Sequence, residues 1–365
     1  MSPSGAMTRA VTATPVAAPS TPVKGDRAPV RVGVVGAGRI GTLHAELLAS
    51  RVEGAKLVAV ADVRPELGAD LAARLGVAQL STADLVRDPG VDAVAICSST
   101  DTHVELIVDA AAAGKAIFCE KPISLDLAEV DRALGAVEHA GVALLVGFNR
   151  RFDPSHRRVH ETVRDGGIGD AYLARITSRD PEPPPVEYAR VSGGIFLDMT
   201  IHDFDMARYV VGSEVVEVSA YGAVRIDPAL AELGDVDTAA VTLRHESGCI
   251  TVIDNCRQAS YGYDQRVEVL GSTGLAASGN PLAHTAFVLD SSGMSAAALP
   301  HFFLERYAAS YREEWEAFVA ALEAGAAMPV SGADGRAALV VGLAAKRSVA
   351  EHRPVLVEEV EDRAI

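Results

Sequence analysis

From residue 30 onward, short apolar runs alternate with longer segments in which apolar residues recur every three or four positions. The short runs are rich in Val, Ile and Ala, which is typical of buried strands. The predicted strands cover 31–35, 56–61, 91–97, 116–119 and 142–146. The predicted helices between them cover 39–50, 65–75, 103–113 and 126–140. Because strands that alternate with helices pair in parallel, we predict a doubly wound α/β sheet.

After about residue 150 the predicted strands follow one another with only turns between them. These strands cover 171–178, 215–226, 236–246, 249–257 and 264–270. Consecutive strands without helices favour a largely antiparallel open sheet, so the second half is predicted to be an α+β domain. Helices are predicted over 306–324, with Trp315 as a core anchor, and over 334–350. The segments 181–185 and 289–300 are predicted to be loops.

These patterns divide the chain into two domains, 29–150 and 151–357, with an acidic tail at 358–365. Residues 1–28 are rich in Ala, Pro, Thr and Ser, and we predict a disordered leader there. Pro and Thr interrupt its apolar positions, so it lacks the continuous apolar core of roughly 7–15 residues that a secretory signal needs.

Composition excludes several classes of protein. The 365 residues include 33 Lys and Arg against 49 Asp and Glu, a net charge of −16 that disfavours binding to nucleic acid or anionic lipid. No apolar stretch approaches the ~20 residues of a membrane span, so no membrane association is predicted. The 4 cysteines lie far apart, which argues against disulfides or a zinc site and favours a cytoplasmic location.

A glycine-rich turn follows the first predicted strand and opens a helix. It reads Gly36-Ala-Gly38-Arg39-Ile40-Gly41. Gly36 permits the tight turn, Gly38 lets the backbone approach a pyrophosphate, and Gly41 lets the helix pack close to the strand. This context predicts a Rossmann domain that binds a dinucleotide.

The second strand ends at Asp62, where a carboxylate should accept the ribose hydroxyls of the cofactor. Its charge would repel a 2′-phosphate, which favours NAD over NADP. Arg64 lies nearby and could hold that phosphate, so NADP stays the alternative.

Candidate catalytic residues occur in two places. Lys121 follows a strand at the carboxyl edge of the parallel sheet, where ligands bind, and could stabilise a developing alkoxide. Asp198 and His202 are four residues apart, on one face of a predicted helix with apolar neighbours. A buried carboxylate there should raise the pKa of the imidazole and fix its tautomer for general-base work; a satisfied core histidine with a helix-capping aspartate is the alternative.

No metal site is predicted. The side chains of Asp203 and Asp205 should leave the predicted helix in other directions than His202, so the three should not converge on one metal ion. His156 and His160 also lie four residues apart, but neighbouring arginines would repel a cation, so we expect an exposed helix face.

With these motifs, the chain resembles the Gfo/Idh/MocA oxidoreductase family over residues 30–357, and within it the inositol 2-dehydrogenases. The resemblance rests on the glycine-rich turn and on Ser98–His103, Ala113–Pro122, Gly147–Pro154, Ser178–Pro181 and Gly194–Arg208. It implies a Rossmann domain that binds NAD and a second domain for substrate binding and oligomerisation.

The resemblance also implies roles for individual residues. His202 would take the hydroxyl proton while hydride passes to the nicotinamide, Asp198 would orient and charge-stabilise His202, and Lys121 would polarise the reacting oxygen. The residues expected to bind other hydroxyls of a polyol are Arg151, Asp180 and Tyr261. The residues expected to line the nicotinamide ribose are Ser98, Thr100, His103 and Glu120. The loops 181–188 and 289–300 are expected to border substrate or subunit contacts.

The implied activity is NAD-dependent oxidation of a cyclitol, foremost myo-inositol to its 2-ketone. Alternatives are a scyllo-inositol or pyranose dehydrogenase with the same residues, a glycosidase that retains NAD, and a sugar-sensing regulatory protein. The second domain's sheet should expose one broad face, so a homodimer or homotetramer is expected.

Overall fold

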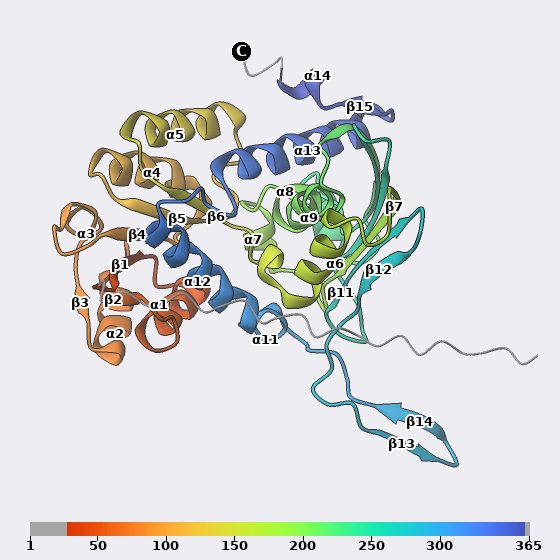
Figure 1. The fold of residues 1–365 in the computed structure, drawn as a ribbon, viewed down its shortest axis with the longest axis horizontal. Helices are drawn as coiled ribbons and strands as arrows, with labels where there is room; N and C mark the ends of the chain where they lie inside the picture. The colour runs from red at the N-terminus through yellow and green to blue at the C-terminus, as the bar shows by residue number, and fades with distance from the viewer. Residues whose placement is uncertain (1–27, 362–365) are drawn as a thin grey trace, which may run out of the picture.

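The computed structural model describes residues 28–361, so the predicted leader, apart from residue 28, and the last residues of the predicted tail lie outside it. The first half of the chain forms a 6-stranded parallel sheet in the order β3-β2-β1-β4-β5-β6, with helices on both faces (Figure 1). Its strands are β1 (Val30–Val35), β2 (Ala55–Ala61), β3 (Ala78–Gln79), β4 (Ala93–Ile96), β5 (Ala116–Glu120) and β6 (Leu144–Gly147). Its helices are α1 (Arg39–Ser50), α2 (Pro65–Leu75), α3 (Thr82–Arg87), α4 (His103–Ala112) and α5 (Leu127–Ala140), and the 3₁₀ turn η1 covers Thr100–Thr102. The predicted doubly wound sheet is therefore confirmed, with β3 and α3 as additional elements.

The second half contains a 7-stranded sheet in the order β12-β11-β7-β10-β9-β8-β15. All neighbours pair antiparallel except β7 and β10, which run parallel. Its strands are β7 (Ala171–Arg179), β8 (Val215–Ala223), β9 (Thr238–His245), β10 (Ile250–Cys256), β11 (Asp264–Gly271), β12 (Leu275–Ser278) and β15 (Val355–Leu356). The predicted α+β domain with a largely antiparallel sheet is confirmed.

One face of this sheet packs against helices and the other is open (Figure 1). The packed helices are α6 (Pro154–Arg164), α9 (Ile201–Val211) and α13 (Gly332–Glu351). Strand β9 shows the alternation that follows: Val241 and Leu243 are buried against the helices, whereas Thr242 and Arg244 are exposed. Smaller elements complete this half: η2 (Asn149–Phe152), α7 (Val186–Ala189), α8 (Ile195–Asp198), α10 (Pro228–Glu232) and α14 (Glu358–Glu361).

Near the end of the chain, a helix returns to the parallel sheet. The segment predicted as one helix over 306–324 forms α11 (Phe303–Arg306) and α12 (Ala308–Ala324). Trp315 of α12 is fully buried and stacks on Phe118 of β5 with ring centroids 4.3 Å apart. Trp315 is therefore the core anchor that the sequence predicted. Its side chain packs in the core of the first half although it comes from the later part of the chain. The two sheets themselves remain separate.

The segment 289–300, predicted as a loop, instead supplies half of a hairpin. Strands β13 (Phe287–Asp290) and β14 (Gly293–Ala296) pair antiparallel and project from the body (Figure 1). The tight turn forms because Asp290 accepts hydrogen bonds from the backbone and hydroxyl of Ser292, and Gly293 adopts φ 127°. The expected loop at 181–185 is irregular, as predicted.

Asp153 stabilises the start of α6 and also neutralises a buried cation. Its carboxylate caps Ser155 and His156 and pairs with the buried guanidinium of Arg306. We expect Asp153→Ala to lower the free energy of unfolding by about 3–5 kcal/mol, because it leaves Arg306 buried without its charge partner. Asp227→Ala, which removes only the cap of α10, should cost about 1 kcal/mol. Urea unfolding of both variants measures the difference, and equal losses would show that the ion pair contributes little.

Candidate active site

The glycine-rich turn has the conformation that the sequence predicted. Gly36 adopts φ 103°, and a Cβ there would collide with the backbone of Cys97 and Ser98. A Cβ on Gly41 would overlap the Gly36 carbonyl, so α1 can approach β1 only with glycine at this position. Nothing lies within 4 Å of a Cβ placed on Gly38, which leaves the turn open on its outer side. Arg39 and Ile40 begin α1, whose N-terminus suits a pyrophosphate.

Asp62 lies beside this turn, one residue after β2. Its carboxylate accepts hydrogen bonds from the backbone N–H of Ala37 at 2.6 Å and of Arg64 at 2.8 Å. The exposed Arg64 guanidinium lies 3.8 Å from the same carboxylate. Asp62, the acidic residue expected at the ribose, therefore lies beside Arg64, the residue that left NADP as the alternative cofactor. Together with the open glycine turn, this arrangement fits a dinucleotide.

At the ends of β4 and β5, a buried histidine joins two loops. His103 Nδ1 lies 2.8 Å from the carbonyl of Pro122, and Nε2 lies 3.1 Å from the carbonyl of Ser98. Burial lowers the pKa of His103, so the ring is neutral. Both nitrogens face backbone oxygens, which suits His103 to positioning the loops rather than to contacting a cofactor. Ser98 and Thr100 are half-buried at the loop surface.

Lys121 connects the two halves of the molecule. Its Nζ donates to the backbone carbonyl of Asp198 at 2.9 Å and lies 3.6 Å from the Asp198 carboxylate. Glu120, one residue earlier, is buried and accepts a hydrogen bond from His44 Nε2 at 2.7 Å. The carboxyl end of β5 thus faces the residues that precede α9, as the catalytic hypothesis requires.

Asp198 and His202 do not share one continuous helix, contrary to prediction. The backbone N–H of Thr200 bonds the carbonyl of Ile195, five residues back, and this wider turn separates α8 from α9. The Thr200 hydroxyl also bonds Asn255, which holds the turn in place.

The Asp198 carboxylate has partners other than His202. It accepts a hydrogen bond from the Tyr188 hydroxyl at 2.8 Å and longer ones from Arg257 at 3.3 and 3.4 Å. Within residues 28–361, no hydrogen bond joins Asp198 to His202.

The prediction that the pKa of His202 is raised is therefore wrong. Burial and the positive charges of Lys121 and Arg150 lower the pKa of His202 well below its usual value, so the imidazole is neutral near neutral pH. Its Nδ1 is buried without a protein partner in the described chain, and the edge of the ring meets Phe148. A neutral imidazole can accept a proton without first losing one.

The two adjacent arginines of η2 have different surroundings. Arg151 makes a bidentate pair with Asp205 and also binds Asp334, so its guanidinium joins α9 to α13. Arg150 binds Asp203 at 2.7 Å and Ser178 at 2.8 Å, and its charge acts on His202. Arg150, which sequence reasoning passed over, is thus the arginine whose charge acts on the candidate base His202. The sequence shows the pair but not which member faces the site.

Asp180 follows β7 in the same region. Burial raises the pKa of Asp180 to about 6, and the charge of Arg257 opposes that rise. Tyr261, which the resemblance also implied as a polyol-binding residue, is half-exposed and hydrogen-bonds Asp264 and Arg179. Tyr188 and Arg257 reach Asp198 instead, and neither was singled out. The only signal for Tyr188 was the proline-rich loop expected to border the substrate.

His156 is not on an exposed face, contrary to prediction. It is buried, and its Nδ1 lies 2.7 Å from the Ser278 hydroxyl of β12. His160 is half-buried and stacks on Tyr209. Strand β12 covers this face of α6, and that contact involves residues 122 positions apart in the chain. The described residues contain no cluster of three or more potential metal ligands.

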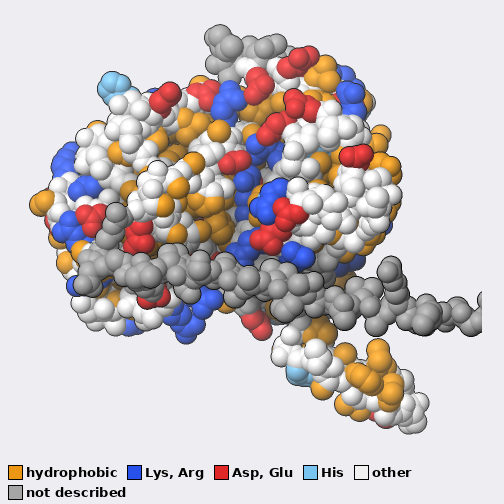
Figure 2. Space-filling model, viewed as in Figure 1, with side chains coloured by type: hydrophobic (Ala, Val, Ile, Leu, Met, Phe, Trp, Pro, Cys, Tyr) orange, Lys and Arg blue, Asp and Glu red, His pale blue; other side chains and the backbone are white. Residues whose placement is uncertain are grey.

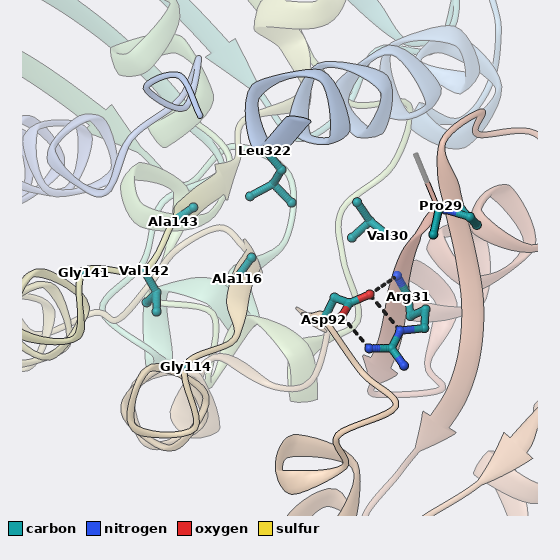
Figure 3. Close-up of a pocket in the computed structure, with 11 residues that line it drawn as sticks. Pro29, Val30, Arg31, Asp92, Gly114, Ala116, Gly141, Val142, Ala143 and Leu322 are labelled. Carbon is teal, nitrogen blue, oxygen red and sulfur yellow. Dashed lines mark hydrogen bonds and ion pairs between the residues drawn. The ribbon is translucent and has the colours of Figure 1, made fainter. Parts of the chain in front are cut away.

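A furrow separates the two halves, with Lys and Arg side chains gathered along it (Figure 2). A different cavity lies at the amino edge of the parallel sheet, where Arg31 and Asp92 form an ion pair (Figure 3). It is lined by Ala28, Pro29, Val30, Arg31, Asp92, Gly114, Ala116, Gly141, Val142, Ala143 and Leu322. Ligands of such sheets bind at the carboxyl ends of the strands, so this cavity is not the candidate site.

No helix within residues 28–361 is long and apolar enough to span a membrane.

Comparison with known proteins agrees with this geometry. The myo-inositol 2-dehydrogenase of Thermotoga maritima is 51% identical over 333 residues, which cover 91% of this chain and 99% of that protein. The crystal structure of a probable dehydrogenase from Thermotoga maritima has a TM-score of 0.89, with 51% identity, 91% of this chain and 100% of that chain covered. The scyllo-inositol dehydrogenase of Lactobacillus casei, solved with NAD(H) and scyllo-inositol, has a TM-score of 0.84, with 31% identity and coverage of 90% and 99%.

Two family models match the chain in succession. Residues 30–148 match the oxidoreductase family with an NAD-binding Rossmann fold, and residues 156–277 match the GFO/IDH/MocA C-terminal domain. The two matches coincide with the parallel and the largely antiparallel sheet. The chain therefore belongs to the Gfo/Idh/MocA family of NAD-binding oxidoreductases.

Proposed function

We propose that this protein is an NAD-dependent dehydrogenase that oxidises a cyclitol, with myo-inositol converted to its 2-ketone. The observation that carries the proposal is the contact between Lys121 and Asp198, which places an ammonium group from the Rossmann half beside the acid–base residues of the other half. The relatives named above support the substrate class.

The bound cofactor would supply the hydride acceptor. Gly36, Gly38 and Gly41 would let the backbone and the start of α1 hold the pyrophosphate, and Asp62 would accept the ribose hydroxyls. Lys121 Nζ would donate to the oxygen of the reacting alcohol and stabilise negative charge on it as the proton leaves.

His202 acts as the general base in this proposal. Its imidazole is neutral, with Nδ1 buried, so Nε2 is the nitrogen assigned to take the hydroxyl proton. The positive charges of Lys121 and Arg150 disfavour the imidazolium, which helps His202 pass the proton on. Asp198 keeps its catalytic assignment, but its contacts favour a role in holding Lys121 rather than His202.

A ring of charged and polar groups fits the remaining hydroxyls of a cyclitol. Asp180 offers two acceptor oxygens, and Arg150 and Arg257 offer donors, so neighbouring hydroxyls can be bound in pairs. We keep Arg151 and Tyr261 as weaker candidates because their partners, Asp205 and Arg179, are not among the residues that contact Asp198 or act on His202. Scyllo-inositol is the second candidate substrate, favoured by the Lactobacillus casei structure that contains it.

We also propose a homo-oligomer formed through the open face of the 7-stranded sheet. Its outward positions include Tyr221, Ile250, Val252, Leu270 and Leu275, all exposed in the single chain. Burying this face would remove apolar surface from water. Sedimentation of the full chain tests the proposal, and a monomer at micromolar concentration would contradict it.

A cytoplasmic location is likewise proposed, on the ground that Cys97, Cys119, Cys249 and Cys256 are all free thiols.

The function is tested by measuring the formation of NADH from NAD⁺, or of NADPH from NADP⁺, with myo-inositol, scyllo-inositol, glucose and xylose. We expect turnover of myo-inositol with NAD⁺, and a weaker reaction with NADP⁺ because Asp62 repels the 2′-phosphate. Binding of NAD⁺ without net oxidation of any polyol would favour the glycosidase or the regulatory alternative.

Replacing the general base should abolish most of this activity. We expect His202→Ala to lower kcat at least ~10²-fold while the Kd for NAD⁺ stays within about twofold, because the imidazole accepts a proton but does not hold the nucleotide. His160→Ala is the matched control, since His160 stacks on Tyr209 outside the site. Substantial activity in His202→Ala would exclude His202 as the base.

The pH dependence should report Asp180. Because the pKa of Asp180 is raised to about 6, the carboxylate is protonated below that pH and ionised above it. We therefore expect kcat/KM for the polyol to rise with pH through about 6, whereas His202 is already neutral there. Asp180→Asn should remove this rise and lower kcat/KM above pH 7 by about tenfold or more. An unchanged profile in Asp180→Asn would assign the titration to another group.

A further inference from the structure

A buried hydrogen-bond chain ends on Glu120, beside the catalytic lysine. The indole Nε1 of Trp315 donates to His44 Nδ1 at 2.8 Å, and His44 Nε2 lies 2.7 Å from Glu120 Oε1. An indole nitrogen can only donate, so His44 Nδ1 must accept. A neutral His44 therefore carries its proton on Nε2 and donates it to Glu120, which leaves that oxygen as an acceptor.

Aromatic packing fixes the chain. Trp315 and His44 are fully buried, and Phe118 contacts both rings, stacked on the first and edge-on to the second. Tyr311 closes the other side of His44, with ring centroids 5.6 Å apart. The members come from α12, α1 and β5, so three elements distant in the sequence determine where the Glu120 carboxylate lies.

A second buried carboxyl group, that of Glu314, is influenced by the charge of Glu120. Glu314 is fully buried, and neither of its oxygens has a hydrogen-bond partner within the described chain. Burial and the negative charge of Glu120 raise the pKa of Glu314 well above its usual value. Burial and, after it, the same charge raise the pKa of the Cys97 and Tyr311 side chains. Within residues 28–361, no Lys or Arg forms a salt bridge with the Glu120 carboxylate.

The position of this charge relative to the cofactor follows from the fold. With Asp62 at the adenosine ribose and the glycine turn at the pyrophosphate, a bound nicotinamide would extend over the carboxyl ends of β4, β5 and β6. Glu120 is the last residue of β5 and immediately precedes Lys121. The nicotinamide ring is cationic in NAD⁺ and neutral in NADH.

We propose that Glu120, oriented by His44 and Trp315, selects the oxidised cofactor by electrostatic attraction and so favours NAD⁺ over NADH. Glu120 is a specificity-determining residue in this proposal, and His44 and Trp315 are positioning residues. The inference deepens the proposed function in its cofactor assignment but is independent of which polyol is oxidised.

The test is the affinity of the full-length protein for each nucleotide without polyol, by titration calorimetry. We expect Glu120→Gln to weaken NAD⁺ binding about tenfold more than NADH binding, because the isosteric amide removes only the charge. A tenfold change in this ratio corresponds to about 30 mV in the two-electron potential of the bound cofactor. Glu314→Gln is the matched control and should leave the ratio unchanged, because it replaces a neutral acid with a neutral amide.

Equal loss of both affinities in Glu120→Gln would overturn the proposal and leave Glu120 a purely structural role. Trp315→Phe supplies a second measurement, since it removes the indole donor but keeps the aromatic packing. In Trp315→Phe, a smaller shift of the NAD⁺/NADH affinity ratio in the same direction supports the positioning role of Trp315 and His44. An unchanged ratio in Trp315→Phe overturns that role, and this measurement remains decisive if Glu120→Gln does not fold. Intact NAD⁺ selectivity without oxidation of any polyol would contradict the proposed function and leave this inference standing.

Discussion

The hydrogen bond from Lys121 Nζ to the Asp198 carbonyl joins the two halves of the molecule at the point where chemistry is proposed. Lys121 begins the loop after a parallel strand, whereas Asp198 ends a short helix over the antiparallel sheet. The relative placement of the two sheets therefore determines whether an ammonium group meets an acid–base pair. Helix α12, anchored by Trp315 in the first core, and the Arg306–Asp153 ion pair help to fix that placement.

Charge in the site is arranged so that positive groups surround a neutral imidazole. Lys121 and Arg150 disfavour protonation of His202, while Asp203 and Ser178 hold the Arg150 guanidinium in place. Such an environment suits a base that must release the proton it accepts. On the cofactor side the charge is reversed, because Glu120 contributes a fixed carboxylate next to Lys121.

Both family matches and the fold agree on an NAD-binding oxidoreductase. Under the proposed function, substrate identity would depend on a smaller set of contacts, because Asp180, Arg150, Arg257 and Tyr188 come from separate segments of the chain. Cyclitols that differ only at one hydroxyl would meet the same groups. For this reason myo- and scyllo-inositol dehydrogenases can share the architecture described above.

The sequence by itself determined the parallel sheet, the largely antiparallel sheet, the glycine turn and the position of Asp62, because these depend on local periodicity and backbone geometry. The tertiary structure alone decided which way side chains point where segments meet. It broke the predicted helix at Thr200, turned Arg150 rather than Arg151 toward His202, and buried His156 under β12. It also lowered the pKa of His202, because folding buries the imidazole and brings the charges of residues 121 and 150 near it. Local patterns carry no information about contacts between residues far apart in the chain, and the chemistry of this site rests on those contacts.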